Sequence, residues 1–314
     1  MFNTDIKSLK DLHKRFPDEK SCIEYLEFIL WNGDPVSPFD PESKVYKFKN
    51  GKYMCGNTKK YFNIKTGTMY ENTKLSLITW FEAMWYITSF KKGISSIQLA
   101  SELCITQKTA WFLLQRIRVN MGIENYNKLE GIVEADETFV GGKNKNRHTN
   151  KKVRFVQAKE GRNHYKDKTI VYGMIQRGGK ITAIVVPDTS GESLFKNALK
   201  YVAKGSAFIT DDHKSYKGLD KFYAKFTVKE NQHQFINQNE TFIHTNHIEG
   251  AWKSLKCIVS GTGTYNHVSP KHMQKYVDEF VYRFNMRKFE QSDRFNWIML
   301  NSRIRTRLKD LANG

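Results

Sequence analysis

The 314-residue sequence has few cysteines, few prolines and no long apolar run. Its four cysteines are widely spaced and none forms a CxxC pair, so neither a disulfide framework nor a cysteine zinc site is indicated. The longest nearly apolar stretch, 75–90, contains Glu82 and runs into two lysines, which makes it too short and too interrupted to span a bilayer. The charged, amphipathic N-terminus is unlike a secretory signal. We therefore expect a cytoplasmic protein without a membrane partner.

Acidic residues are also scarce, since 32 Asp and Glu stand against 51 Lys and Arg, for a formal net charge of +19. This excess favours a polyanionic partner. Nucleic acid is the first choice, because Lys and Arg side chains that neutralise phosphates release condensed counterions. The alternative is a basic protein whose charge only keeps it in solution.

The pattern of apolar residues divides the chain into four parts. Residues 1–70 begin with a short helix and continue in short alternating runs typical of small β-hairpins. Residues 71–125 have a helical period, and residues 128–290 alternate between strands and helices. Residues 291–314 form a basic C-terminal tail. The third part predicts an α/β fold with a sheet flanked by helices.

Two short helices in the second part flank a tight turn. The first covers 95–103 and begins with a serine, and the second is capped near Thr106. This arrangement is typical of a helix-turn-helix that binds DNA, although an ordinary helical hairpin is the alternative. Candidate DNA contacts on the second helix are Gln107, Lys108 and Arg116.

A stretch dense in Lys, Arg, Asn and His separates the first two strands of the third part. We interpret it as a long basic loop or hairpin. It follows the first strand directly, and we expect Lys143, Lys145 and Arg147 to contact DNA.

Three acidic residues occupy positions where an α/β sheet places functional groups. Asp136 lies in the first strand, expected at 131–140, and Asp211 ends a later apolar strand, expected at 206–211. Glu249 lies near a helix start. Unpaired, these carboxylates would repel one another and raise each other's pKa, and divalent cations would relieve the repulsion. Carboxylate oxygens suit Mg²⁺ or Mn²⁺, whereas Zn²⁺ prefers His or Cys.

Neighbouring residues leave alternatives open. Asp212 follows Asp211 and should point the other way on an extended chain. Glu134 shares a strand face with Asp136 and could also approach the cations, whereas Glu137 should face away. Asn246 is a minor alternative to Glu249 as the third residue.

Several motifs in order resemble the DDE transposases of bacterial insertion sequences. The resemblance is greatest to the branch, related to Merlin elements, that joins an N-terminal zinc ribbon and a helix-turn-helix to a ribonuclease-H-like catalytic domain. It implies a mixed sheet flanked by helices for that domain. It spans roughly residues 50–288, and the motifs nearest the acids are VEADETFVGGKNKNRH, ITDDHKSYKGL and HTNHIEGAWKSLK. The resemblance implies that Asp136, Asp211 and Glu249 bind two Mg²⁺ or Mn²⁺ ions, and that Lys256 is the family's lysine.

The helix that carries Glu249 has a spacing consistent with this assignment. Glu249, Trp252 and Lys256 lie at i, i+3 and i+7, so they share a helix face about 10 Å long. A carboxylate at one end could hold metal while a cation further along meets a phosphate. The candidate phosphate contacts on this helix are Lys253 and Lys256.

The sequence departs from the family pattern in the zinc ribbon. The family's two cysteine pairs correspond here to Ser37, Asp40, Cys55 and Thr58. One thiolate cannot form a closed tetrahedral site, so we expect a degenerate ribbon without zinc. Aromatic side chains should hold its shape, namely Tyr46, Phe48, Tyr53 and Phe62.

The leading hypothesis is a DDE transposase that cleaves DNA at transposon ends and joins the 3′-hydroxyl ends to target DNA. Its partners would be the terminal inverted repeats and target DNA, bound by a homodimer or higher oligomer, and a bacterial protein would associate with the nucleoid. The alternatives are a domesticated transposase that only binds DNA and a ribonuclease-H-like nuclease without strand transfer.

Overall fold

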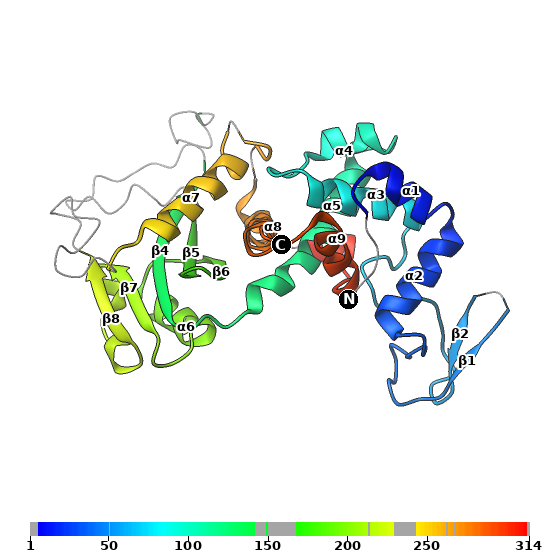
Figure 1. Cartoon of the computed structure of the whole chain (residues 1–314), viewed down its shortest axis with the longest axis horizontal. Coiled ribbons are helices and arrows are strands. Elements are labelled where there is room, and N and C mark those ends of the chain that lie inside the picture. The colour runs from blue at the N-terminus through cyan, green and yellow to red at the C-terminus, as the bar shows by residue number, and fades with distance from the viewer. Residues whose placement is uncertain are drawn as a thin grey trace. The chain divides into compact units, whose positions relative to one another are not determined.

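The computed structural model describes residues 6–49, 51–141, 149, 168–212, 214–228, 243–261, 263–266 and 268–312. The chain forms two compact units (Figure 1). Unit 1 comprises residues 1–123 and 288–314, and unit 2 comprises residues 124–287. In the part of the chain that is described, no helix has the length and apolar character needed to cross a membrane.

Unit 1 is mainly helical. Phe81 of α3 packs edge-on against Phe295 of α9, and the Tyr25 hydroxyl of α2 donates to Asn296 Oδ1 at 2.7 Å. Helix α9, which lies in the segment predicted as a basic C-terminal tail, therefore packs against α2 and α3. Its helices are α1 (Leu9–Arg15), α2 (Glu19–Trp31), α3 (Leu77–Ser89), α4 (Ser96–Glu102), α5 (Gln107–Met121), α9 (Gln291–Leu300) and α10 (Leu308–Ala312).

The predicted pair of short helices is α4 and α5, and both have the expected caps. Ser95 Oγ accepts the Gln98 N–H at 3.1 Å, and Thr106 Oγ1 accepts the Thr109 N–H at 3.3 Å. These bonds satisfy amides that a helix start leaves without a partner. Cys104, between the helices, has a left-handed φ of 51°. The helices and their caps are confirmed, and DNA binding by them stays a prediction.

A three-stranded antiparallel sheet in unit 1 consists of β1 (Val45–Lys47), β2 (Tyr53–Cys55) and β3 (Tyr61–Phe62). Tyr53, Cys55 and Phe62 form its buried core, with Trp31 against them. Tyr46 and Phe48 are 43% and 38% exposed. The expectation that aromatic residues hold this region is confirmed for Tyr53 and Phe62, which lie in its core. The Phe48 ring contacts the Tyr61 ring outside that core, and neither Tyr46 nor Phe48 is part of the core. Successive strand residues alternate between faces, and these two lie on the outer one.

Hydroxyl groups surround the one cysteine that remains at the predicted ribbon positions. Burial raises the pKa of the Cys55 thiol, but hydrogen bonds with Ser37, Ser43 and Thr58 outweigh that effect and lower the pKa to about 6. Ser37 Oγ also accepts the Asp40 N–H at 3.3 Å. Hydrogen bonds thus join Cys55 to Ser37 and Thr58. Ser37 is also bonded to Asp40, so all four positions that correspond to the family's cysteines are connected.

We predict that the purified protein contains no stoichiometric zinc. A single thiolate among hydroxyl groups cannot supply the four ligands of a structural zinc site. Elemental analysis after removal of any affinity tag measures the metal content. One equivalent of zinc per chain would contradict the prediction.

Unit 2 contains a five-stranded sheet with the order β6-β5-β4-β7-β8. Strands β4, β5 and β6 pair antiparallel, whereas β4, β7 and β8 pair parallel. The sheet is therefore mixed, as predicted. Its strands are β4 (Ile132–Val140), β5 (Thr169–Gln176), β6 (Ile181–Val186), β7 (Ala207–Asp211) and β8 (Ala224–Val228).

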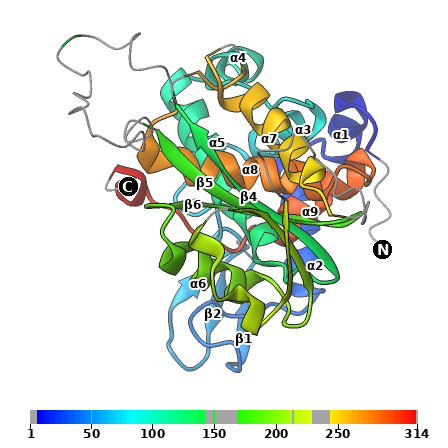
Figure 2. The same ribbon diagram turned by 90° about the vertical axis from the view of Figure 1, so that its left-hand side faces the viewer.

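Helices cover both faces of this sheet (Figure 2). On one face α7 (Asn246–Val259) and α8 (Met273–Asn285) enclose a core with β5 and β6. On the other face α6 (Gly191–Tyr201) packs over Val133 and Ala135 of β4. Because strand residues alternate, the even-numbered residues of β4 point toward α7. This alternation determines which β4 acids can reach the helix that carries Glu249.

Candidate active site

Strand pairing places Asp136 beside Asp211. In the parallel pair β4–β7, Glu134 lies opposite Ile209. The pairing ends there, and extending this register by two residues brings Asp136 level with Asp211, the last residue of β7. Both side chains are partly buried, whereas the neighbouring Asp212 is exposed.

The third predicted acid, Glu249, lies in the first turn of α7. The Thr245 hydroxyl donates to Glu249 Oε1 at 3.0 Å and holds this carboxylate at the helix start. Asn246 is the first residue of α7 and is exposed.

The pKa of Asp136 shows that the three acids interact. This pKa is raised from 3.8 to about 6, first by burial and then by the negative charges of Asp211 and Glu249. Hydrogen bonds from the Glu137 backbone and from Trp252 act in the opposite direction. Three separate elements, β4, β7 and α7, thus bring their carboxylates close enough to interact.

Trp252 of α7 holds Asp136 from the helix side. Its indole Nε1–H donates to Asp136 Oδ2 at 3.0 Å. Gly173 of β5 lies opposite Asp136 in the sheet, and a Cβ atom at Gly173 would overlap the Trp252 ring. The glycine leaves the space that the indole occupies. The sequence pattern did not show this contact, since it depends on the β4–β5 register.

Glu134 shares the strand face of Asp136, as predicted, but its bonds are to the start of α7. Oε2 accepts the backbone N–H groups of His247 and Ile248 at 2.9 and 3.2 Å. Oε1 accepts Arg177 Nε at 2.7 Å. These contacts satisfy the carboxylate of Glu134, which is fully buried, without a metal ion.

Glu137 faces the opposite side of the sheet, also as predicted. The Tyr216 hydroxyl donates to Glu137 Oε1 at 2.6 Å. Burial raises the Glu137 pKa to about 7, and the charges of Asp136 and Asp211 contribute. Tyr216 lies in a 3₁₀ turn, Lys214–Tyr216, just after Asp211, so this bond ties β4 to the end of β7.

One histidine-containing group also has the spacing of a metal site. The ligand atoms of Glu134, His244 and His247 lie within 4.8 Å of one another, and in the described part of the chain no other group of three or more does so. The carboxylate oxygens of Asp136, Asp211 and Glu249 therefore do not all lie within 4.8 Å of one another. However, Arg177 Nε is bonded to Glu134 Oε1, so a cation there would lie against a guanidinium group.

The donor chemistry of the Asp136, Asp211 and Glu249 group fits Mg²⁺ or Mn²⁺ better. All three side chains are carboxylates, the ligands that these hard cations prefer. Burial raises the pKa of Asp136, and the negative charges of Asp211 and Glu249 also contribute to the rise. A divalent cation would remove the repulsion among these charges.

The predicted DNA contacts fall into three groups. Gln107, Lys108, Lys253 and Lys256 are exposed, the first two on α5 and the others on α7. Lys143, Lys145 and Arg147 lie outside the described residues.

Arg116 differs from the other candidates, because it is only 4% exposed. Its Nη2 donates to the Glu71 carbonyl at 2.7 Å, and its guanidinium lies over the Trp80 ring. As placed, it stabilises unit 1, and it is not among the DNA contacts proposed below.

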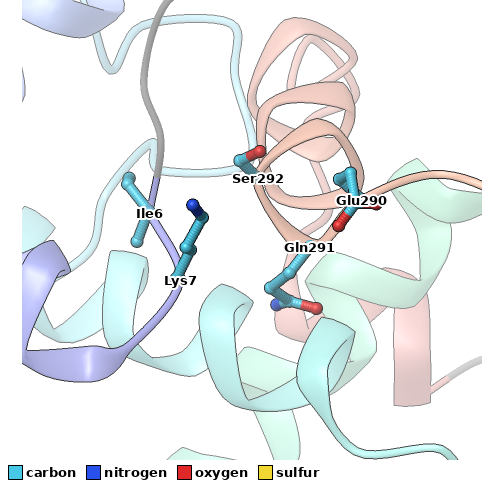
Figure 3. Close-up of a pocket in the computed structure, with 5 residues that line it drawn as sticks. All are labelled: Ile6, Lys7, Glu290, Gln291 and Ser292. Atoms are coloured by element: carbon cyan, nitrogen blue, oxygen red, sulfur yellow. The ribbon is translucent and has the colours of Figure 1, made fainter.

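Unit 1 contains a pocket of about 390 Å³ (Figure 3). None of the predicted site residues lines it. The Gln291 amide in its wall donates to Thr88 Oγ1 and Ser89 Oγ at 2.8 and 2.7 Å, so this group joins α9 to α3. The lining residues are Ile6, Lys7, Glu290, Gln291 and Ser292.

Comparison with known families identifies the domain that forms unit 2. Residues 128–285 match the ISXO2-like transposase domain. The chain belongs to this transposase family. The matched segment contains Asp136, Asp211 and Glu249 and covers nearly all of unit 2.

A relative of this ISXO2-like transposase is an uncharacterized protein in the transposable element ISH50 of Halobacterium salinarum. It is 24% identical over 245 residues, which cover 75% of this chain and 81% of the halobacterial protein.

Two solved structures of Mos1 complexes also overlap the chain. The Mos1 strand transfer complex is 12% identical, with a TM-score of 0.29, and covers 71% of this chain and 75% of the Mos1 chain. The Mos1 paired-end complex is 12% identical, with a TM-score of 0.26, and covers 71% of this chain and 79% of that chain.

We predict that Asp136→Asn raises the melting temperature of the metal-free transposase at pH 8. Because the pKa of Asp136 is raised in the folded state, ionisation of this group lowers the free energy of unfolding as pH rises from 3.8 through about 6. The amide is uncharged and still accepts the Trp252 N–H, so it removes this loss.

Thermal unfolding at pH 5 and pH 8, in buffer with a chelator, measures the effect. The variant should exceed the wild type by a few degrees at pH 8 and by about half as much at pH 5, where part of the loss is already present. Asp212→Asn is the matched control on an exposed acid. Equal shifts at both pH values would mean that Asp136 carries no buried charge.

Proposed function

We propose that this chain is a DDE transposase whose catalytic residues are Asp136, Asp211 and Glu249 in a ribonuclease-H-like domain. The observation that supports the proposal best is the shared electrostatics of the three acids. They come from β4, β7 and α7, and the charges of Asp211 and Glu249 raise the pKa of Asp136. Membership of the transposase family agrees with this assignment.

The reaction would be cleavage of DNA at transposon ends, followed by joining of the 3′-hydroxyl to target DNA. Two Mg²⁺ or Mn²⁺ ions bound to the three carboxylates would activate the attacking oxygen and stabilise the leaving oxygen. The protein supplies the geometry. Trp252 orients one oxygen of Asp136, and Thr245 orients Glu249. Exposed Lys253 and Lys256 on the same helix would hold phosphates of the bound DNA.

DNA binding would use both units. Gln107 and Lys108 lie at the exposed start of α5, where a helix-turn-helix meets a DNA groove. Lys143, Lys145 and Arg147 follow β4 in sequence and would add contacts beside the active site. The net charge of +19 supports a duplex partner. Pairing of two transposon ends calls for a homodimer or higher oligomer on DNA.

A domesticated protein that binds DNA without strand transfer is the second candidate. The observation that favours it is the loss of three of the four family cysteine positions near β2. The three intact acids favour an active enzyme instead. A ribonuclease-H-like nuclease would use the same acids and would differ only in lacking the joining step.

We predict that Asp136→Asn, Asp211→Asn and Glu249→Gln each abolish cleavage and joining. Each change keeps the shape of the side chain and removes the charge that a divalent cation requires. Binding to end-bearing duplex should be retained or slightly tighter, because anionic repulsion falls. Cleavage and joining are measured separately on labelled duplex, with and without Mg²⁺.

Asp212→Asn and Asn246→Ala are the matched controls and should stay active. Loss of activity in Asp212→Asn but not in Asp211→Asn would move the second acid by one residue. Cutting by all three amide variants would rule out the DDE assignment. Cleavage without joining in the wild type would favour the nuclease, and neither reaction would favour the domesticated protein.

We predict that Lys108→Ala weakens DNA binding and lowers the salt slope by about one, as loss of a single phosphate contact does. Lys20→Ala, another exposed lysine of unit 1, is the control and should leave both quantities unchanged. Fluorescence anisotropy over a range of salt concentrations measures them. An unchanged slope for Lys108→Ala would identify α4 and α5 as an ordinary helical hairpin.

A further inference from the structure

Helix α7 begins without a side-chain cap of its own. Its N-cap residue, Thr245, makes no capping bond, and its hydroxyl donates instead to Glu249 Oε1 at 3.0 Å. The first amides of a helix need acceptors from elsewhere. Here those of His247 and Ile248 donate to Glu134 Oε2 at 2.9 and 3.2 Å. Strand β4 therefore caps α7.

The same carboxylate joins the helix to a second part of the sheet. Glu134 Oε1 accepts Arg177 Nε at 2.7 Å, just after β5. Arg177 Nη2 donates in turn to the His244 carbonyl at 3.0 Å, just before α7. Glu134 is fully buried, and its negative charge is offset by Arg177 and by the positive end of the helix dipole. One carboxylate thus connects β4, the end of β5 and the start of α7.

These contacts determine where two of the proposed catalytic residues lie. Asp136 is two residues after Glu134 on the same strand face, and Glu249 is one residue after Ile248. Any change in how α7 meets β4 changes the separation of the Asp136 and Glu249 carboxylates. Mg²⁺ requires nearly ideal octahedral ligands and does not tolerate such a change well.

We propose that Glu134 is a positioning residue that sets the separation of Asp136 and Glu249 before a cation binds. Its role toward Glu249 rests on the function proposed above, whereas its role as the α7 cap does not. On this proposal the group of Glu134, His244 and His247 has a structural role, because Arg177 pairs with Glu134, and it is not a metal site. We call this group with Arg177 the clamp.

The test compares the wild type with Glu134→Gln, in which one oxygen can still accept amides but the charge opposite Arg177 is lost. Hydrogen exchange at the His247 and Ile248 amides should become at least about tenfold faster. Mn²⁺ affinity, measured by titration calorimetry, should fall about 10–100-fold. Cleavage should lose kcat with little change in the KM for DNA, and excess Mn²⁺ should restore part of the activity.

Two further variants complete the design. Glu192→Gln removes an exposed first-turn carboxylate from α6 and should change none of these quantities. Arg177→Lys keeps the positive charge but loses the guanidinium group that also reaches the His244 carbonyl. It should reproduce the Glu134→Gln pattern with smaller changes, and it serves as the test if Glu134→Gln does not fold.

Three results would overturn the proposal. Unchanged amide exchange and Mn²⁺ affinity in folded Glu134→Gln, or in Arg177→Lys if the first variant does not fold, would show that the clamp positions nothing. A lower melting temperature with unchanged Mn²⁺ affinity would show a purely structural role. Loss of one whole Mn²⁺ equivalent would make Glu134 a ligand. If the wild type binds no Mn²⁺, the proposed function fails, and the exchange rates still test the cap.

Discussion

The burial of three carboxylates on one strand is the constraint on which unit 2 depends. A carboxylate removed from water must be paired, hydrogen-bonded or protonated. Glu134 is paired with Arg177 and the start of α7, and Glu137 is bonded to Tyr216 with a raised pKa. Asp136 accepts the Trp252 N–H yet keeps a raised pKa beside two other acids. Of the three, it is the one whose surroundings favour an added cation.

The fold and the site are connected through these side chains. Glu134 holds the helix that carries Glu249, and Glu137 holds the turn that follows Asp211. Strand β4 therefore contacts both elements that supply the other acids, besides carrying Asp136 itself. Gly173 contributes from β5, because the absence of a Cβ lets the Trp252 ring lie over the sheet next to Asp136.

The sequence predicted much of this arrangement. Alternating apolar residues indicated strands at 131–140 and 206–211, and observed β4 and β7 lie within one residue of those bounds. The same alternation predicted that Glu134 and Glu137 face opposite sides. The alternation of apolar residues does not predict contacts between segments that are distant in the sequence. The cap from Glu134 depends on how α7 meets β4, and Arg116, polar in a helical run, lies on a buried helix face.

The central claim is that the acids on β4, β7 and α7, rather than the nearby histidine group, hold the cation. Anomalous diffraction from crystals soaked in Mn²⁺ tests it most directly, because it locates the metal without any assay of activity. The account predicts anomalous density between the carboxylates of Asp136, Asp211 and Glu249. Density at Glu134, His244 and His247, with none at the three acids, would contradict it.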